Sequence, residues 1–207
     1  MEESQNVAIT QPDITMWQNL KVRGLLFPAN PKVLEIGEAN WFQDCTDPNF
    51  TQLNRMEDSF EAARSFYRVM LGYSKIEAVD LQGKTALKCD LNFPHPSLGW
   101  NGGWDIVINT GTTEHVFDQS RVFRSIHDWT AMGGLMIHCA PHFLKHHGFY
   151  NYNPCLFDDI AAANGYEKLY GRVEEFQGGE VLCLAYRKMK GGEFAVPYQR
   201  SLGLEKP

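Results

Sequence analysis

Several acids in this chain stand directly after apolar runs, where buried strands are expected to end. Glu35 precedes Gly37 by two residues in the run VLEIG, and Asp80 and Asp90 end the next two apolar runs. A glycine turn lets the backbone approach a ligand, and carboxylates at these places accept hydrogen bonds from ribose hydroxyls or an adenine amine. The pattern therefore indicates a pocket for an adenosine-containing cofactor, although each acid alone fits a solvated strand end equally well.

A second polar group, Glu114 and His115, follows the apolar run WDIVINT at 104–110. An imidazole beside a carboxylate can take a proton from a hydroxyl that is about to react. We therefore predict Glu114 and His115 as the catalytic pair. The alternative for His115 is a histidine that only hydrogen-bonds its own loop.

A third group lies in PHFLKHHGFYNYNP at 141–154, which combines histidines with aromatic and amide side chains. Aromatic walls with polar tips suit a cyclic, polar small molecule, so His142, His146, Tyr150 and Asn151 are predicted to bind it. The spacing of His142 and His146 would suit a metal on one helical turn, but no nearby Cys or acid completes a ligand set. A plain surface loop is the other interpretation of this segment.

Apolar periodicity predicts the elements that position these residues. Strands are expected at 33–37, 74–80, 85–90, 104–110 and 135–140, helices at about 56–70, 119–131 and 154–164, and a terminal hairpin at 167–176 and 180–188. Asn54 with Glu57 resembles a capping box for the first helix, and Gly133-Gly134 is expected to stop the second. This alternation predicts an α/β fold: a Rossmann-like three-layer αβα sandwich with a mostly parallel seven-stranded sheet and an antiparallel C-terminal hairpin.

Composition narrows the class of protein further. The chain has 207 residues and a net charge of −6, with five cysteines that form no CxxC pair. We expect one domain over 1–207, with a lead-in segment at 1–30 that covers the sheet, a core at 33–188 and a tail at 189–207. The acidic balance argues against nucleic acid as the partner, and the cysteines and the acidic first residues favour a cytoplasmic location away from membranes. A homodimer stays open.

The motifs, taken together, resemble those of a known family. EIGEAN at 35–40, VD at 79–80, CDLNFP at 89–94, WDIVINTGTTEHVFD at 104–118 and MGGLMIHCAP at 132–141 are similar in order and spacing to motifs of the class I S-adenosylmethionine-dependent methyltransferases. The likeness covers roughly residues 33–188. It implies that S-adenosylmethionine is the cofactor and that a seven-stranded sheet carries the site.

The resemblance also implies a role for each matched residue. Those expected to contact the cofactor are Glu35, Gly37 and Glu38 at the methionine end, Asp80 and Leu81 at the ribose, Asp90 and Leu91 at the adenine, and Asn109, Thr110 and Gly111 at the sulfonium. In the similar ubiquinone-pathway O-methyltransferases a metal-binding E-x-x-E-H pattern occupies the place of Glu114-His115. Gly111 stands where that pattern has its first acid, so no metal is predicted here.

The chain departs from the family at two places. Ala39 and Trp41 stand where the family has its second and third glycines, and Trp41 is expected either to narrow the methionine pocket or to offer its ring face to the sulfonium. The connection LQGK at 81–84 is too short for a parallel crossover, so the strand at 85–90 is expected to be a stub or to pair irregularly.

The leading hypothesis is S-adenosylmethionine-dependent methyl transfer to oxygen or nitrogen of a small polar acceptor, such as a sugar or a natural-product precursor. A non-catalytic protein with the same fold, acting as a scaffold or binding subunit, is the alternative that Ala39 and Trp41 favour. A nicotinamide-dependent oxidoreductase is a third reading, but the glycine spacing is wrong for a dinucleotide pyrophosphate.

Overall fold

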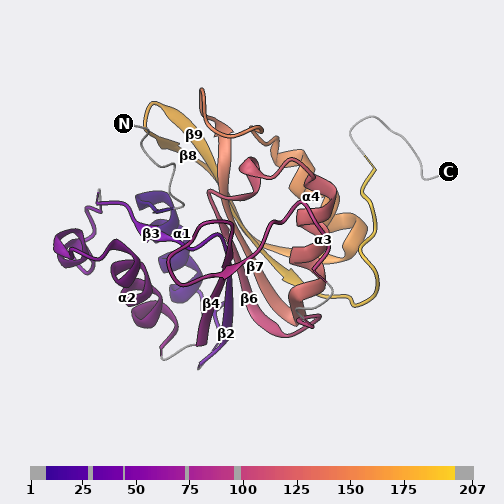
Figure 1. The fold of residues 1–207 in the computed structure, drawn as a ribbon, viewed down its shortest axis with the longest axis horizontal. Helices are drawn as coiled ribbons and strands as arrows, with labels where there is room; N and C mark the ends of the chain where they lie inside the picture. The colour runs from indigo at the N-terminus through magenta and orange to yellow at the C-terminus, as the bar shows by residue number, and fades with distance from the viewer. Residues whose placement is uncertain (1–7, 28–29, 44, 73–74, 96–98, 199–207) are drawn as a thin grey trace.

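Seven strands form one central sheet in the computed structural model, which describes residues 8–27, 30–43, 45–72, 75–95 and 99–198 (Figure 1). In sheet order the strands are β5 (Leu87–Lys88), β4 (Lys75–Asp80), β2 (Lys32–Ile36), β6 (Trp104–Thr110), β7 (Thr130–Phe143), β9 (Gly179–Lys188) and β8 (Tyr166–Phe176). The first five run parallel, and β9 is antiparallel to both β7 and β8. The predicted fold class is confirmed. The outermost parts of the predicted lead-in and tail, 1–7 and 199–207, lie outside the described residues.

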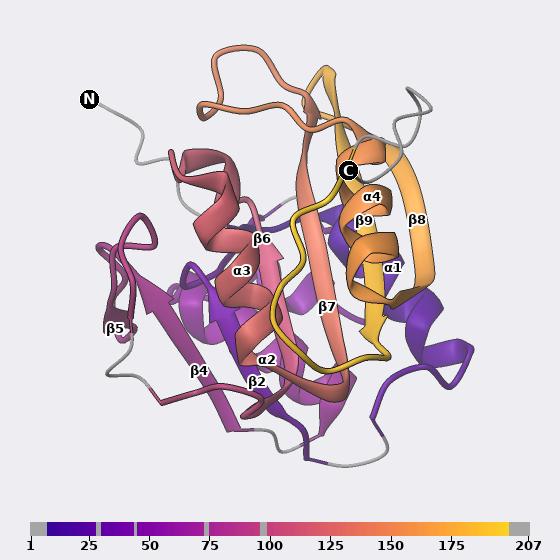
Figure 2. The same ribbon diagram turned by 90° about the vertical axis from the view of Figure 1, so that its right-hand side faces the viewer.

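Helices cover both faces of the sheet. α1 (Gln11–Val22) and α2 (Ser59–Leu71) lie on one face, and α3 (Gln119–Trp129) and α4 (Pro154–Asn164) lie on the other (Figure 2). Because successive side chains of a strand point to opposite faces, β2 supplies Val33 to the first layer and Leu34 to the second. Both faces of the central strands are therefore buried, which explains why these strands read as continuous apolar runs. In the described part of the chain no helix is long and apolar enough to cross a membrane.

Two helix boundaries differ from the sequence prediction. α2 begins at Ser59, because the Asp58 side chain accepts hydrogen bonds from the amides of Phe60 and Glu61, and Asn54 instead lies in the 3-10 helix η1 (Thr51–Arg55). α3 ends at Trp129, before the glycines that were expected to stop it. Gly134 lies inside β7 at a register shift, and a Cβ there would come within 3.0 Å of the Asp105 carbonyl oxygen. These glycines serve the bulge in the strand, not the helix end.

Two short pieces of strand structure lie near β2: the edge strand β5 and a small second sheet. β5 is a two-residue stub, as expected, and the described residues 81–86 before it contain no helix. The expectation that this connection is too short for parallel pairing is wrong, because β5 pairs in parallel with Val79 and Asp80 after the loop turns back on the Asp80 carboxylate. A second sheet was not predicted: β1 (Ala8–Ile9) pairs in parallel with β3 (Asn40–Trp41). The segment that follows the Gly37 turn therefore continues as a short strand, and α2 starts only at residue 59.

Candidate functional site

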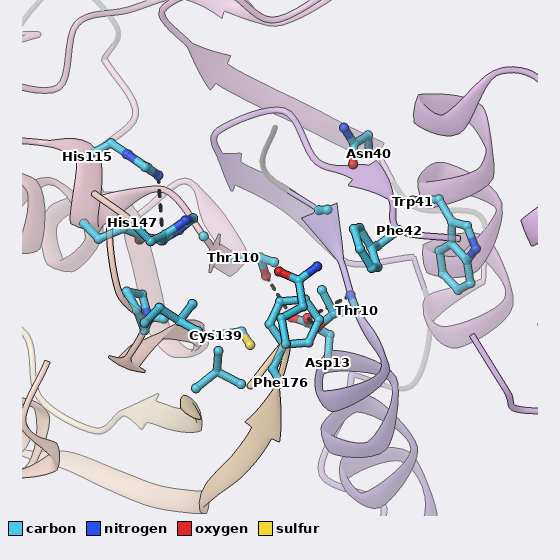
Figure 3. Close-up of a pocket in the computed structure, with 18 of the residues that line it drawn as sticks. Thr10, Asp13, Asn40, Trp41, Phe42, Thr110, His115, Cys139, His147 and Phe176 are labelled. Atoms are coloured by element: carbon cyan, nitrogen blue, oxygen red, sulfur yellow. Dashed lines mark hydrogen bonds and ion pairs between the residues drawn. The ribbon is translucent and has the colours of Figure 1, made fainter. Parts of the chain in front are cut away.

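A cleft of about 750 Å³ opens at the carboxyl ends of β6 and β7 (Figure 3). Its walls come from the start of α1, from β3, from the loops after β6 and β7, and from the turn between β8 and β9. This is the edge at which open α/β sheets bind their ligands. The volume lies within the range of small-molecule sites.

One end of the cleft carries a cluster of Glu114, His115 and His147, which we call the acceptor-end cluster. Oε1 of Glu114 lies 3.1 Å from Nε2 of His147 and 4.0 Å from Nε2 of His115. The Glu114 side chain is fully buried, whereas about a third of each imidazole is exposed. The structure thus brings together the predicted catalytic pair and a histidine that the sequence did not join to it.

Two anchors hold this cluster in place. The 3-10 helix η3 (Thr113–His115) is held by Asn109 near the end of β6. The Asn109 side chain accepts from the Thr113 amide at 3.1 Å and donates to the Thr113 hydroxyl at 3.0 Å. The loop after β7 is tied to η3 because the Phe149 amide donates to the Glu114 carbonyl oxygen at 2.8 Å. Gly148 makes this approach possible, since its φ is +65° and a Cβ would lie 2.8 Å from Cγ of Glu114.

The electrostatics of the cluster are asymmetric. The hydrogen bond to Glu114 raises the pKa of His147, while burial lowers the pKa of His115 despite the nearby carboxylate. Among the described residues, Oε2 of Glu114 has no hydrogen-bond partner. A buried carboxylate oxygen without a partner is costly, and such an atom indicates a missing ligand or a catalytic role.

The middle of the cleft is lined by Thr110 and Gly111, both predicted to lie beside the sulfonium. The Thr110 hydroxyl donates to Asp13 at 3.1 Å, and the Gly111 amide donates to the Cys139 carbonyl oxygen at 2.8 Å. Burial raises the pKa of Asp13, although hydrogen bonds from Thr10 and Thr110 favour its ionised form. The N-terminal part of the chain therefore contributes a buried acid to the cleft, which the sequence reading had not assigned to the site.

The carboxylate of Asp80, the acid predicted to bind the ribose, already accepts hydrogen bonds from nearby backbone amides. It accepts from the amides of Glu38, Gln82 and Gly83 at 2.7–2.9 Å. These contacts fold residues 81–86 back against the turn after β2. In this arrangement Asp80 acts as a loop-closing residue.

Glu38 lies beside Asp80, and its own carboxylate is also bound by the protein. Its side chain is 1% exposed and receives hydrogen bonds from the Thr85 amide at 2.7 Å, from the Thr85 hydroxyl and from Arg64 at 2.9 Å. Burial alone would raise the pKa of Glu38, but the hydrogen bonds from Thr85 and Ala86 and the charge of Arg64 hold it below its ordinary value. We call Glu38, Arg64 and Thr85 the cofactor-end cluster.

Glu35 points into the core toward α2. Burial raises the pKa of Glu35 to about 8, although the nearby Tyr67 hydroxyl, the Arg64 charge and the Ala39 amide favour ionisation. At neutral pH this carboxyl is therefore mostly protonated. Gly37 forms the predicted tight turn, with a φ of +83° and its amide donating to the Val79 carbonyl oxygen.

Trp41 belongs to the core at the edge of the cleft. Its indole N–H donates to Oδ1 of Asn54 at 2.7 Å, and its ring lies 5.6 Å from the ring of Phe66 in α2. Figure 3 shows this ring on the far side of the cleft from Thr110. Trp41 also lines the cleft, so one part of this side chain faces the cleft while its ring packs on α2.

The predicted cofactor residues therefore divide into two sets. Thr110 and Gly111 line the cleft. The other eight, all within the described residues, do not: Glu35, Gly37, Glu38, Asp80, Leu81, Asp90, Leu91 and Asn109. The cofactor-end cluster lies outside this lining, on the side of β2 and β4.

The four predicted acceptor-binding residues lie near the cleft but not in its lining. Asn151 closes the loop by bonding both the amide and the carbonyl oxygen of Leu144, and the Tyr150 hydroxyl donates to the Phe117 carbonyl oxygen. His142 bonds the Tyr152 carbonyl oxygen at 2.8 Å, and His146 is exposed. These contacts shape the loop that delivers His147. The signal that points to His147 is topological, because the loops after the neighbouring strands β6 and β7 must meet.

Several solved structures have a fold similar to that of this chain. A 1,6-didemethyltoxoflavin-N1-methyltransferase from Burkholderia thailandensis superposes with a TM-score of 0.55 at 13% identity, over 85% of this chain and 77% of that one. An S-adenosylmethionine-dependent methyltransferase from Mesorhizobium loti gives 0.53 at 13% identity, over 86% and 98%. Another from Archaeoglobus fulgidus gives 0.55 at 10% identity, over 86% and 94%.

No protein-family model and no curated protein sequence matches the chain. The structural likeness extends over most of the chain, since each of these three superpositions covers 85% or 86% of it. The chain has the fold of the class I S-adenosylmethionine-dependent methyltransferases.

Proposed function

We propose that the protein transfers a methyl group from S-adenosylmethionine to an oxygen or nitrogen atom of a small polar acceptor. The observation that carries this proposal is the content of one cleft: Thr110 and Gly111 stand beside the acceptor-end cluster at the carboxyl ends of β6 and β7. The fold supports it as well. One similar structure, from Burkholderia thailandensis, holds both 1,6-didemethyltoxoflavin and S-adenosylhomocysteine.

Each lining group has a part in this reaction. S-adenosylmethionine, when bound, supplies an electrophilic methyl group. Thr110 and Gly111 would hold its sulfonium end, and Glu114 and His115 would orient the acceptor and promote loss of its proton. Because methyl transfer is an in-line displacement, alignment in a pocket that excludes water accounts for much of the rate.

A net charge of −6 favours a small molecule over nucleic acid as the acceptor. We place this enzyme in the cytoplasm. The loop at 141–154, with His142, His146, Tyr150 and Asn151, is proposed to border the acceptor, since it forms the rim next to His147.

The second candidate is a non-catalytic subunit with this fold, and the cofactor-end cluster is the observation that favours it. Glu38 and Asp80 are satisfied by the protein itself, so a ligand on that side has to replace existing hydrogen bonds. The two candidates differ in whether S-adenosylmethionine binds at all.

Calorimetric titration with S-adenosylmethionine and S-adenosylhomocysteine separates them. An enzyme binds both, and incubation with methyl-labelled S-adenosylmethionine and a small-molecule extract of the source cells then yields a labelled product. His115→Ala should lower labelling while leaving cofactor affinity unchanged. Absence of binding and of a thermal shift at millimolar cofactor would refute the enzyme and leave the scaffold.

A further inference from the structure

We infer that the acceptor-end cluster is a binding site for one divalent transition-metal ion, held by Glu114, His115 and His147 with its open positions facing the cleft. This inference reverses the sequence expectation of no metal. That expectation counted ligands within one motif, where Gly111 replaces an acid. The fold supplies the third ligand from a different loop, 33 residues after Glu114.

The geometry of the three side chains suits an ion. One ligand atom from each residue lies within 4.8 Å of the other two, and the Glu114–His147 pair is at 3.1 Å. Ligands about 2.1 Å from a tetrahedral ion lie about 3.4 Å apart, so small movements of the partly exposed imidazoles close the set. The rings of His115 and His147 are 5.0 Å apart and steeply inclined, which lets both nitrogens approach one point.

The carboxylate supplies the independent sign of a missing ligand. Oε2 of Glu114 is buried and has no partner among the described residues, although the Glu114 side chain has no exposed surface. An ion between the imidazoles would neutralise this charge where water does not reach it. The backbone holds the ligands in place, since Gly148 packs on Glu114 and the Phe149 amide bonds its carbonyl oxygen.

The donor set selects the class of ion. Two imidazoles and one carboxylate suit Zn²⁺, Fe²⁺ or Co²⁺ better than Mg²⁺ or Ca²⁺, which prefer oxygen ligands. Three protein ligands leave at least one coordination position open. If the proposed methyl transfer is correct, an acceptor hydroxyl bound there loses its proton to water more readily and becomes a better nucleophile.

Titration of the metal-free full-length protein with Co²⁺, followed by visible absorption and calorimetry, tests the site. We expect one ion per chain with the spectrum of a nitrogen- and oxygen-ligated site, and competition by Zn²⁺. His147→Ala removes a ligand itself, so it should weaken binding by more than the roughly 10- to 100-fold that loss of an outer-shell partner costs. His146→Ala is the matched control: this neighbouring, exposed histidine is outside the cluster, and its loss should leave binding unchanged.

A second variant tests the site in case His147→Ala fails to fold. Gly148→Ala keeps all three ligands but places a Cβ against Glu114, so it should weaken Co²⁺ binding while circular dichroism stays native. Equal Co²⁺ affinity in wild type and His147→Ala would mean an adventitious ion only and overturn the inference, as would no binding at millimolar Co²⁺. Neither S-adenosylmethionine nor acceptor is present, so this failure is distinct from failure of the proposed function, which cofactor titration reports separately.

Discussion

Two regions of the molecule hold their acids in different ways: the cofactor-end cluster with Asp80 and Glu35, which lies outside the cleft lining, and the acceptor-end cluster, which lies within it. At the cofactor end, Glu38 and Asp80 accept hydrogen bonds from Arg64, Thr85 and backbone amides. Glu35 points into the core, is mostly protonated at neutral pH and keeps Oε1 without a described partner. At the acceptor end, Glu114 is as deeply buried and also keeps one oxygen without a described partner. Glu38 and Asp80 therefore stabilise the local structure, whereas Glu114 is the acid in this comparison that both lines the cleft and keeps an oxygen available to a ligand.

The connection lengths explain this difference. Residues 81–86 join β4 to β5 without a helix, so this short loop folds back onto the turn after β2. Its amides donate to the carboxylates of Asp80 and Glu38. After β6 the chain makes only the short η3 before α3, and the neighbouring loop approaches it through Gly148. The second arrangement leaves space between two loops, and the cleft occupies that space.

Glu35 gives the largest expected effect at the cofactor end. Its pKa is about 8 in the folded protein against an ordinary value of 4.5, so the native state holds a proton that the unfolded chain releases. Wild-type stability is therefore intact below pH 4.5 and falls as pH rises toward 8. Relative to wild type, Glu35→Gln should gain up to about 1.4 kcal/mol per pH unit over that range, or roughly 3–5 kcal/mol at pH 8.

Urea unfolding of wild type and Glu35→Gln at pH 5 and pH 8 measures this gain. Glu167→Gln makes the same substitution at an exposed site and is the control for the loss of one carboxylate. A constant difference between Glu35→Gln and wild type across pH would show that Glu35 is ionised in the native state, and the contrast between the two ends would then weaken.

The sequence was sufficient for the fold because alternating apolar runs specify strands and helices locally. Element ends were less predictable: Asn54 and Asp58 both resemble caps, and only packing decides that Asp58 starts α2. At the site, Glu114 and His115 were predicted because they follow a strand whose carboxyl end opens on the crevice, and both line the cleft. His147 was not joined to them, since that contact depends on the close approach of Gly148, which no motif records.

Asp80 offers the next test, because it separates a role in the loop from a role in cofactor binding. Asp80→Ala removes the acceptor of three backbone hydrogen bonds and should lower the free energy of unfolding by about 1–3 kcal/mol. Asp105→Ala is the matched control, since Asp105 accepts from the Lys32 amide at the opposite end of the sheet. Both variants should lose stability in urea unfolding.

Only Asp80→Ala should also weaken S-adenosylmethionine binding, by roughly 10-fold or more in calorimetric titration, if the ribose reaches this carboxylate. Unchanged affinity in Asp80→Ala would show that the cofactor does not use this end. Ligand binding would then be confined to the cleft that contains the acceptor-end cluster.

Trp41 gives the smallest expected effect and tests whether the missing glycines of the first motif matter. Trp41→Phe removes the hydrogen bond from the indole N–H to Asn54 but keeps an aromatic ring beside Phe66, so we expect a loss of about 1 kcal/mol in unfolding free energy. Because the ring packs toward α2, S-adenosylmethionine affinity should not change. A large drop in affinity with little loss of stability would mean that the ring turns into the cleft when cofactor binds. The cofactor end would then be a site that rearranges on binding, in contrast to an acceptor end whose side chains are already in place.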